Sequence, residues 1–138
     1  MPSSADPGYS GTPLPAKLGV TSGRRVLLDG APAGFDLGPL PPDVVVHARA
    51  GRSPYDVGVM FCPDLRRLVR RWPLLHEAVT PAGRLWVAWP KRSGGLATDL
   101  DEGLVRAHGL ARGRVDVKLC ALDATWSGLA FVVRTKDR

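Results

Sequence analysis

The stretch that decides the fold is Leu85-Trp86-Val87-Ala88-Trp89-Pro90-Lys91-Arg92-Ser93-Gly94-Gly95-Leu96-Ala97-Thr98-Asp99. Its first five residues are apolar without a polar break, which is typical of a parallel strand that is buried on both faces. Pro90 predicts the end of this strand, because proline has no N–H to donate to a central ladder. The serine and glycines that follow predict a turn. Thr98-Asp99, with Glu102 three residues after Asp99, predicts a capping box at the start of a helix.

The place of this loop in the chain predicts a ligand site. In open α/β sheets, ligands bind at the carboxyl ends of the strands, and this strand end carries two cations beside flexible glycines. Asp29 and Gly30, which end the first predicted strand, face the same crevice. Cations and free backbone amides suit a phosphate or a carboxylate. The residues that we expect to bind a ligand are Asp29, Gly30, Lys91, Arg92, Ser93, Gly94, Thr98 and Asp99.

Both parts of this predicted site have a structural alternative. The basic loop also fits a solvated turn that ends in a helix cap. Asp29 also fits a tight turn, in which its carboxylate would accept hydrogen bonds from nearby backbone groups.

Strands and helices alternate along the rest of the chain, which indicates an α/β fold. Strands are predicted at 25–29, 44–48, 55–61, 85–89, 115–122 and 126–134, and helices at 12–19, 64–79 and 101–111. A short turn joins the last two strands, which predicts a β-hairpin. We expect a single doubly wound, Rossmann-like sheet that is mostly parallel. The expected strand order is 2-1-3-4-6-5, with an antiparallel sixth strand.

The length of 138 residues fits one domain with a sizeable core. Residues 1–8 are small, polar and proline-bearing, so we expect a disordered tail there. One α/β domain should follow at 9–134, and a charged tail at 135–138. In the first helix, Thr12 should be the N-cap and Gly19 the stop signal.

Charge and cysteine usage restrict the possible partners and compartment. The net charge of +6 is compatible with nucleic acid, anionic ligands or acidic proteins. No signal peptide and no bilayer-spanning stretch is visible, so we expect a cytoplasmic protein without a membrane partner. Cys62 and Cys120 lack a metal-binding spacing. In the predicted sheet they lie roughly 14 Å apart, beyond the ~7 Å between Cα atoms that a disulfide allows.

Four arginines fall on the polar side of the helix predicted at 64–79, and their spacing predicts one basic stripe. Such a stripe can bind nucleic-acid phosphates without sequence preference. The alternative is a solvated helix face, because no aromatic residue interleaves the stripe. The four residues are Arg66, Arg67, Arg70 and Arg71.

Several separated blocks together resemble domain of unknown function 3052, a family of small bacterial proteins. The blocks are Tyr9-Ser10-Gly11-Thr12-Pro13-Leu14, Lys17-Leu18-Gly19, Trp86-x-x-Trp89-Pro90-Lys91, Thr98-Asp99-Leu100 and Asp123-x-Thr125-Trp126-Ser127-Gly128-Leu129. The resemblance covers nearly the whole chain from Tyr9 to Arg134. It implies no established activity that could be carried over.

The strand pattern also resembles a trimmed class I methyltransferase. Tyr55-Asp56-Val57 precedes one apolar strand and Pro81-Ala82-Gly83-Arg84-Leu85 opens the next, as in the middle of that fold. Two features depart from that family. Its methyl-donor loop has three alternating glycines, whereas Ala31-Pro32-Ala33 follows Gly30 here. Its second strand ends in an acid that holds ribose, whereas His47-Ala48-Arg49 stands here.

From these patterns we expect a domain that binds an anionic small molecule or a nucleotide, with no evident catalytic constellation. The sequence does not identify a cofactor. The alternatives are a diverged methyltransferase-like enzyme and a basic adaptor that binds nucleic acid or an acidic protein.

Overall fold

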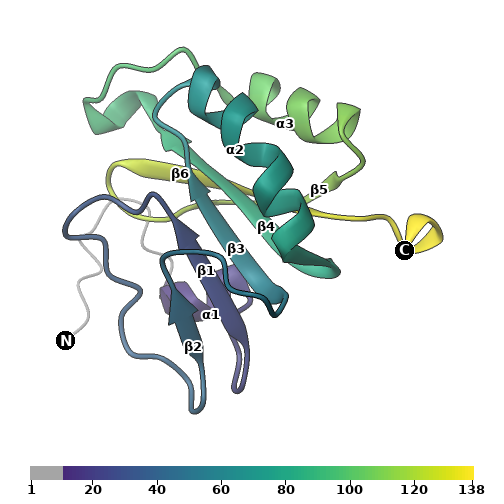
Figure 1. The fold of residues 1–138 in the computed structure, drawn as a ribbon. Helices are drawn as coiled ribbons and strands as arrows, with labels where there is room; N and C mark the ends of the chain where they lie inside the picture. Colours follow the sequence, from purple (N-terminus) through teal and green to yellow (C-terminus); the bar gives the residue numbers. More distant parts are fainter. Residues whose placement is uncertain (1–10) are drawn as a thin grey trace.

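The computed structural model describes residues 11–138, which form a six-stranded sheet (Figure 1). The strands are β1 (Arg25–Asp29), β2 (Val45–His47), β3 (Tyr55–Phe61), β4 (Val79–Pro90), β5 (Val115–Ala121) and β6 (Trp126–Val132). Their order across the sheet is β2-β1-β3-β4-β6-β5. The first four pair in parallel, whereas β6 is antiparallel to both β4 and β5. The predicted α/β class, strand order and C-terminal hairpin are therefore confirmed.

Helices cover the two faces of the sheet unevenly. α2 (Leu65–Ala78) and α3 (Glu102–Ala111) lie side by side in front of the sheet in Figure 1, and α1 (Leu14–Leu18) lies behind it. Within residues 11–138, the rear face is completed by the loop 30–44, which contributes the buried Leu37 and the half-buried Phe35. A full helical layer is thus present on one face of a mixed sheet, rather than on both faces as expected.

β4 is the central strand that both cores share. Leu85, Val87 and Trp89 point into the core beneath α2 and α3, whereas Trp86 and Ala88 point into the core beneath α1. All five side chains are buried. The uninterrupted apolar run therefore has the physical origin that the sequence predicted, because each face of this strand meets its own core.

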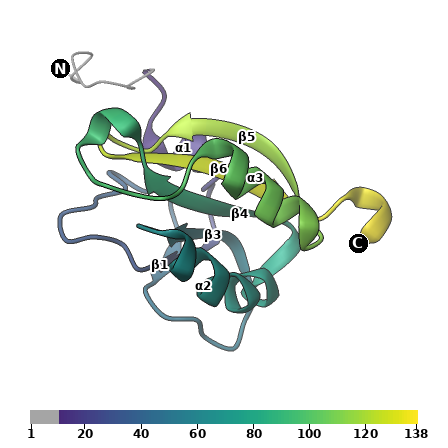
Figure 2. The same ribbon diagram turned by 90° about the horizontal axis from the view of Figure 1, so that it is seen from above.

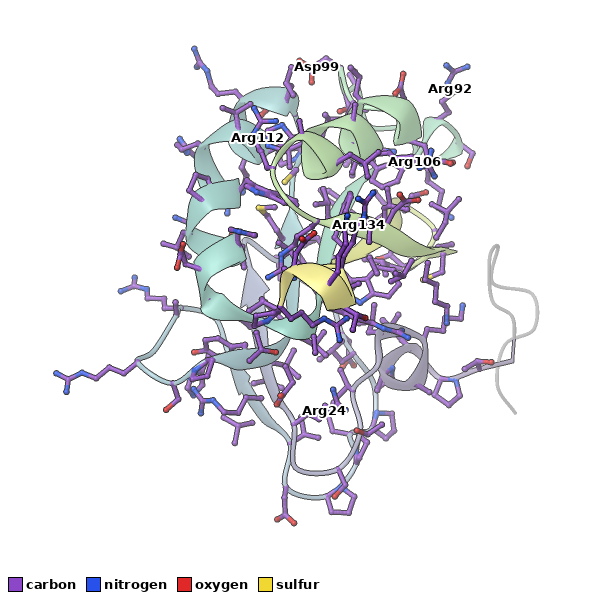
Figure 3. All side chains as sticks on the ribbon, turned by 90° about the vertical axis from the view of Figure 1, so that its right-hand side faces the viewer. Arg24, Arg92, Asp99, Arg106, Arg112 and Arg134 are labelled. Atoms are coloured by element: carbon purple, nitrogen blue, oxygen red, sulfur yellow. The ribbon has the colours of Figure 1, made fainter. Side chains whose placement is uncertain are left out.

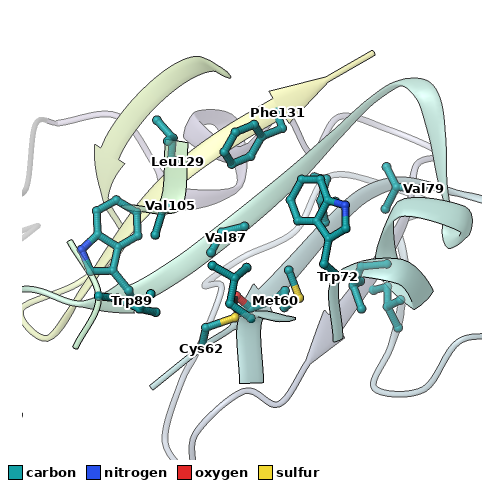
Figure 4. Close-up of a cluster of buried hydrophobic side chains, with 14 of the residues drawn as sticks. Met60, Cys62, Trp72, Val79, Val87, Trp89, Val105, Leu129 and Phe131 are labelled. Carbon is teal, nitrogen blue, oxygen red and sulfur yellow. Dashed lines mark hydrogen bonds between the residues drawn. The ribbon is translucent and has the colours of Figure 1, made fainter. Parts of the chain in front are cut away.

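Aromatic side chains close both cores. In the first core, shown in Figure 4, Trp72 of α2 and Phe131 of β6 pack edge to face with their ring centroids 5.5 Å apart. In the second core, the Trp86 indole N–H donates a hydrogen bond to the Leu18 carbonyl oxygen at 3.0 Å. This bond satisfies a buried donor and fixes α1 against the sheet.

β4 begins six residues before the expected start at Leu85, directly after α2. The ladder with β3 shifts between the pairs Tyr55–Val79 and Val57–Arg84, so β4 carries extra residues in a bulge. The buried Arg114 holds this segment, since its guanidinium donates to the carbonyl oxygens of His76, Val79 and Gly83. The sequence left residues 80–84 outside any predicted element, because the donors that hold this segment come from a residue far along the chain.

The remaining differences lie at the ends of elements. Pro13, not Thr12, is the N-cap of α1, while Gly19 is its C-cap with a left-handed φ of 88°. The charged segment 135–138 contains a short 3-10 turn, η2 (Thr135–Asp137). The tail expected at 1–8 lies outside the described residues.

The sheet separates the two cysteines. Cys62 belongs to the core beneath α2 and α3, and Cys120 packs against the core on the other face; both thiols are free. Burial raises the pKa of the Cys62 thiol to about 12, which leaves it unreactive as a nucleophile at neutral pH. None of the helices in residues 11–138 is long and apolar enough to cross a bilayer.

Two histidines make the fold sensitive to acid. His76 accepts a hydrogen bond from Arg114 Nε at 2.9 Å, and His108 packs edge-on against Trp72 with the ring centroids 5.4 Å apart. Burial is the main cause that lowers the pKa of both rings below 6.5, and Arg114 and Arg112 respectively add to it. In acid, the unfolded chain therefore binds more protons than the folded chain does. The free energy of unfolding falls as the pH drops below about 6.5.

We expect the free energy of unfolding to be lower at pH 5.5 than at pH 7.5, by an amount that shrinks when both histidines are replaced. The variant is His76→Gln with His108→Gln, and the measurement is urea unfolding at each pH. The free energies of unfolding of the wild type and the variant should converge towards acid pH. An equal pH dependence in the two proteins would show that the rings are not responsible.

Candidate functional site

A pocket of about 540 Å³ opens where β4 ends. Its walls come from the carboxyl end of β4, the loop that leads to α3, the first turn of α3, and Ser127 at the start of β6. Figure 2 shows this loop leaving β4, curling through the 3-10 turn η1 (Arg92–Gly94) and returning to start α3. The lining residues are Trp89, Pro90, Lys91, Arg92, Leu96, Ala97, Thr98, Asp99, Leu100, Asp101, Glu102 and Ser127.

The structure divides the predicted site residues into two groups. Lys91, Arg92, Thr98 and Asp99 line this pocket together. Asp29 and Gly30 do not line it, and neither do Ser93 and Gly94. The sequence therefore predicted the place of the pocket, but only half of the residues assigned to it.

The two cations of the pocket have no ionic partner among residues 11–138. Lys91 is half-buried and Arg92 is exposed, and neither side chain makes a hydrogen bond or an ion pair there. Figure 3 shows Arg92 extending outward from the same end of the molecule as Asp99. Both positive charges are thus available to a ligand.

Trp89 supplies a third unpartnered donor. Its side chain is packed in the first core and only 5% of the residue is exposed, yet it lines the pocket. Figure 4 shows the indole nitrogen on the side of the ring away from Val105 and Leu129. Its N–H makes no hydrogen bond within the described chain, so it adds a donor to the two cations. The fully buried side-chain atoms without a partner in residues 11–138 are Trp72 Nε1 and His108 Nε2, and neither residue lines this pocket.

The three carboxylates of the pocket, in contrast, are all engaged. Asp99 Oδ1 accepts from the backbone N–H of Leu65 at 2.8 Å, and Asp101 Oδ1 accepts from that of Leu104 at 2.8 Å. Glu102 Oε2 pairs with Arg106 at 2.7 Å. Each carboxylate therefore has one oxygen fixed by the protein.

The predicted capping box at Asp99 was wrong. Asp101 is the N-cap of α3, and Asp99 caps α2 from outside that helix, alongside its own N-cap Asp64. The first turn of α2 and the end of the basic loop lie next to each other at the edge of the sheet. A cap of this kind could not be found from local spacing, because Leu65 lies 34 residues from Asp99.

Asp29 and Gly30 lie apart from this pocket, and Gly30 lines a second pocket of about 370 Å³ together with Leu28, Ala31 and residues 46–48. Asp29 is buried and forms ion pairs with Arg67 at 3.0 Å and with Arg71 at 2.7 Å. Gly30 has a left-handed φ of 72°, and a Cβ at this position would collide with the Arg67 guanidinium. Arg67 also donates to the Phe61 carbonyl oxygen at 2.9 Å, so its side chain is held across the end of β3.

These ion pairs also divide the predicted basic stripe. Arg67 and Arg71 turn towards Asp29, and the hydrogen bond to Asp29 raises the pKa of Arg71. Arg66 and Arg70 are exposed and make no ion pair within residues 11–138. The prediction of one continuous stripe of four arginines was wrong, because the buried carboxylate of Asp29 in β1 forms ion pairs with two of them.

Gly94 has a supporting role, whereas Ser93 is exposed. A Cβ at residue 94 would press on the backbone of Thr125, and the Lys91 N–H donates to the Thr125 carbonyl oxygen at 2.9 Å. Asp123 in turn accepts from the backbone N–H groups of Thr125 and Trp126, both at 2.8 Å. The basic loop is thus docked on the hairpin turn, which gives the pocket a fixed wall.

Sequence reasoning missed Trp89, Asp101 and Ser127 as lining residues. Trp89 stands in an uninterrupted apolar run, which assigned it to the core, and its ring does pack there. The signal that could have identified it is its indole N–H, a polar group at the end of the strand. Among residues 11–138, no group of three or more metal-ligating side chains is placed to hold a metal ion.

No protein-family model matches the chain. No curated protein sequence matches it. The resemblances to domain of unknown function 3052 and to methyltransferases therefore stay predictions.

Proposed function

We propose that this chain is a ligand-binding domain that holds an anionic small molecule or nucleotide in the pocket at the end of β4. One observation carries the proposal: the side chains there without a protein partner include three donors, Lys91, Arg92 and the buried indole of Trp89. Charge-assisted contacts to a phosphate or carboxylate would satisfy all three. The pocket volume of about 540 Å³ falls within the usual range of small-molecule sites.

The carboxylates of the same pocket support a binding role. Asp99 and Asp101 each accept a backbone N–H of a helix, and Glu102 is paired with Arg106. Each of these carboxylates therefore already has a structural partner, and its side chain is held in place for contact with a ligand.

We also propose that the fold is a reduced Rossmann-like, doubly wound arrangement and that the chain belongs with domain of unknown function 3052. The strand order with its topological switch between β1 and β3 supports the first part. The short α1 and the loop 30–44 would stand for the helices of the second face. The Asp123 turn and the Trp86–Leu18 bond give structural roles to three of the blocks that carry the resemblance.

The methyltransferase alternative has less support. A methyl-donor site would use the crevice after β1, and Arg67 lies across Gly30 there. The adaptor alternative keeps only Arg66 and Arg70 of its four arginines as free contacts.

The double replacement Lys91→Met with Arg92→Met tests the proposed function. Both side chains keep much of their bulk and lose their charge, so the free energy of unfolding should change by only a few tenths of a kcal/mol, about as usual for exposed positions. The ligand that copurifies from an extract of the protein's own cells should be lost. Native mass spectrometry of the wild type and the variant measures this loss.

The matched control is Arg66→Met with Arg70→Met, which removes two unpaired cations from α2 and leaves the pocket intact. It should retain the ligand. Equal retention in both double variants would contradict the proposed function. Loss in the control alone would favour a contact surface on α2.

A further inference from the structure

We infer that the ligand of this pocket is zwitterionic, with an anionic group at Lys91 and Arg92 and a protonated amine at the carboxylates of the opposite wall. This inference rests on the proposed function and narrows its ligand class. Its basis is the distribution of unused hydrogen-bonding capacity around the pocket. A nucleotide without an amine falls outside the inferred class.

Each carboxylate of the pocket keeps one oxygen without a partner in the described chain. The protein engages Asp99 Oδ1, Asp101 Oδ1 and Glu102 Oε2, and no hydrogen bond or ion pair engages the second oxygen of any of them. An ionised carboxylate offers about four lone-pair sites. The wall formed by the start of α3 therefore has acceptors to spare, whereas the wall formed by the end of β4 has donors to spare.

The balance of charge argues against a ligand that is only anionic. Two cations and three carboxylates line the pocket. Although hydrogen bonds from helix N-termini and Arg106 offset the carboxylates in part, a dianion would still meet like charges on one side. A ligand that carries both signs meets an opposite charge on each side, and gains from both contacts.

Trp89 adds one further donor to the pocket. The residue is 5% exposed and packs in the first core, and its indole N–H makes no hydrogen bond within the described chain. The apolar residues Leu96, Ala97 and Leu100 line the space between the charged walls. They suit a short hydrocarbon spacer between the two charged groups of the ligand.

The basic and acidic walls come from opposite ends of one loop. Arg92 stands just after β4 and Asp99 just before α3, and Figure 3 shows them apart from each other at the same end of the molecule. No ion pair joins the cations to the carboxylates in residues 11–138. The separation keeps both signs available, which a directly paired lysine and aspartate would not do.

The test compares two series of probes of equal length. Aminoalkyl phosphates with two, three or four methylenes carry both charges, and the corresponding alkyl phosphates carry only the anion. Each probe is titrated into the full chain labelled with nitrogen-15, and the dissociation constant is read from the backbone amides of residues 96–102. In at least one length, the aminoalkyl phosphate should bind about fivefold more tightly, as expected for a partly exposed ion pair.

The variant Asp99→Asn with Asp101→Asn and Glu102→Gln removes all three negative charges of the acidic wall. Asparagine caps helices about as well as aspartate, so α3 should remain intact. In the variant, the aminoalkyl phosphate and the alkyl phosphate should bind with about the same dissociation constant. The affinity for the alkyl phosphate should not be lower than in the wild type. Asp116→Asn is the matched control, because Asp116 also pairs with Arg106 but does not line the pocket; it should keep the preference.

The outcomes separate the two proposals. Equal affinities for both series in the wild type would overturn the zwitterion and leave the anion site in place. A preference that survives in this triple variant would also overturn the zwitterion, since the amine would then bind elsewhere. If neither series shifts the amides of the pocket, both proposals are wrong.

Discussion

Replacing Gly109 with alanine is expected to destabilise the fold by about 1–3 kcal/mol, although the same change in most helices stabilises by up to ~1 kcal/mol. Gly109 lies in α3, where a Cβ would collide with the ring of Phe131. That ring is fully buried and packs against Trp72, so it has no free space to move into. Because α3 approaches β6 this closely, the helix must either shift or lose its contact.

Gly103 on the same helix is the matched control. It is exposed, and the nearest atom to a Cβ there is Asp101 Oδ1 at 3.4 Å. Gly103→Ala should therefore raise the free energy of unfolding slightly, by up to about 1 kcal/mol. Urea unfolding of both variants measures the contrast. Two stabilised variants would mean that the contact between α3 and β6 is looser than described.

The second large effect is expected from Asp29→Asn, which keeps the shape of the side chain and removes its charge. The two arginines around it would lose their charge partner and a strong acceptor, and would crowd beneath the end of β1. Removing one partner of a fully buried pair costs about 3–5 kcal/mol. Arg67 and Arg71 keep 23% and 30% of their side chains exposed, so we expect about 2–3 kcal/mol here.

Asp116→Asn provides the comparison for this change as well. Asp116 forms one ion pair with Arg106 at 2.9 Å, and both side chains are about a third exposed. Exposed pairs of this kind contribute little to stability, because water screens them. Chemical denaturation at neutral pH distinguishes the two variants. A loss in Asp29→Asn no greater than in Asp116→Asn would show that the Asp29 cluster is not a stabilising centre.

The sheet could be predicted from the sequence because its signals are local. The apolar run before Pro90, the alternation around Gly58 and the short turn between the last two strands each depend on neighbours in the chain. β1 and β3 were predicted to the residue, and the strand order followed from the handedness and shortness of connections. The loop after β4 was placed correctly for the same reason.

The identity of the site residues could not be predicted to the same degree. Asp99 reaches Leu65, Arg71 reaches Asp29, and Arg114 reaches Gly83, across 34, 42 and 31 residues respectively. In each of these contacts, a charged side chain binds a partner that the neighbouring sequence does not indicate. The partners of Asp29 are two arginines 38 and 42 residues away, which the sequence around Asp29 does not indicate.

The hydrogen bond from the Leu65 amide to Asp99 has a consequence for communication through the fold. The Asp99 carboxylate both lines the pocket and accepts a hydrogen bond from the first turn of α2. A ligand that binds Asp99 therefore competes with the helix for this carboxylate. By thermodynamic reciprocity, whatever loosens or tightens the beginning of α2 must then change the affinity of the pocket by the same factor.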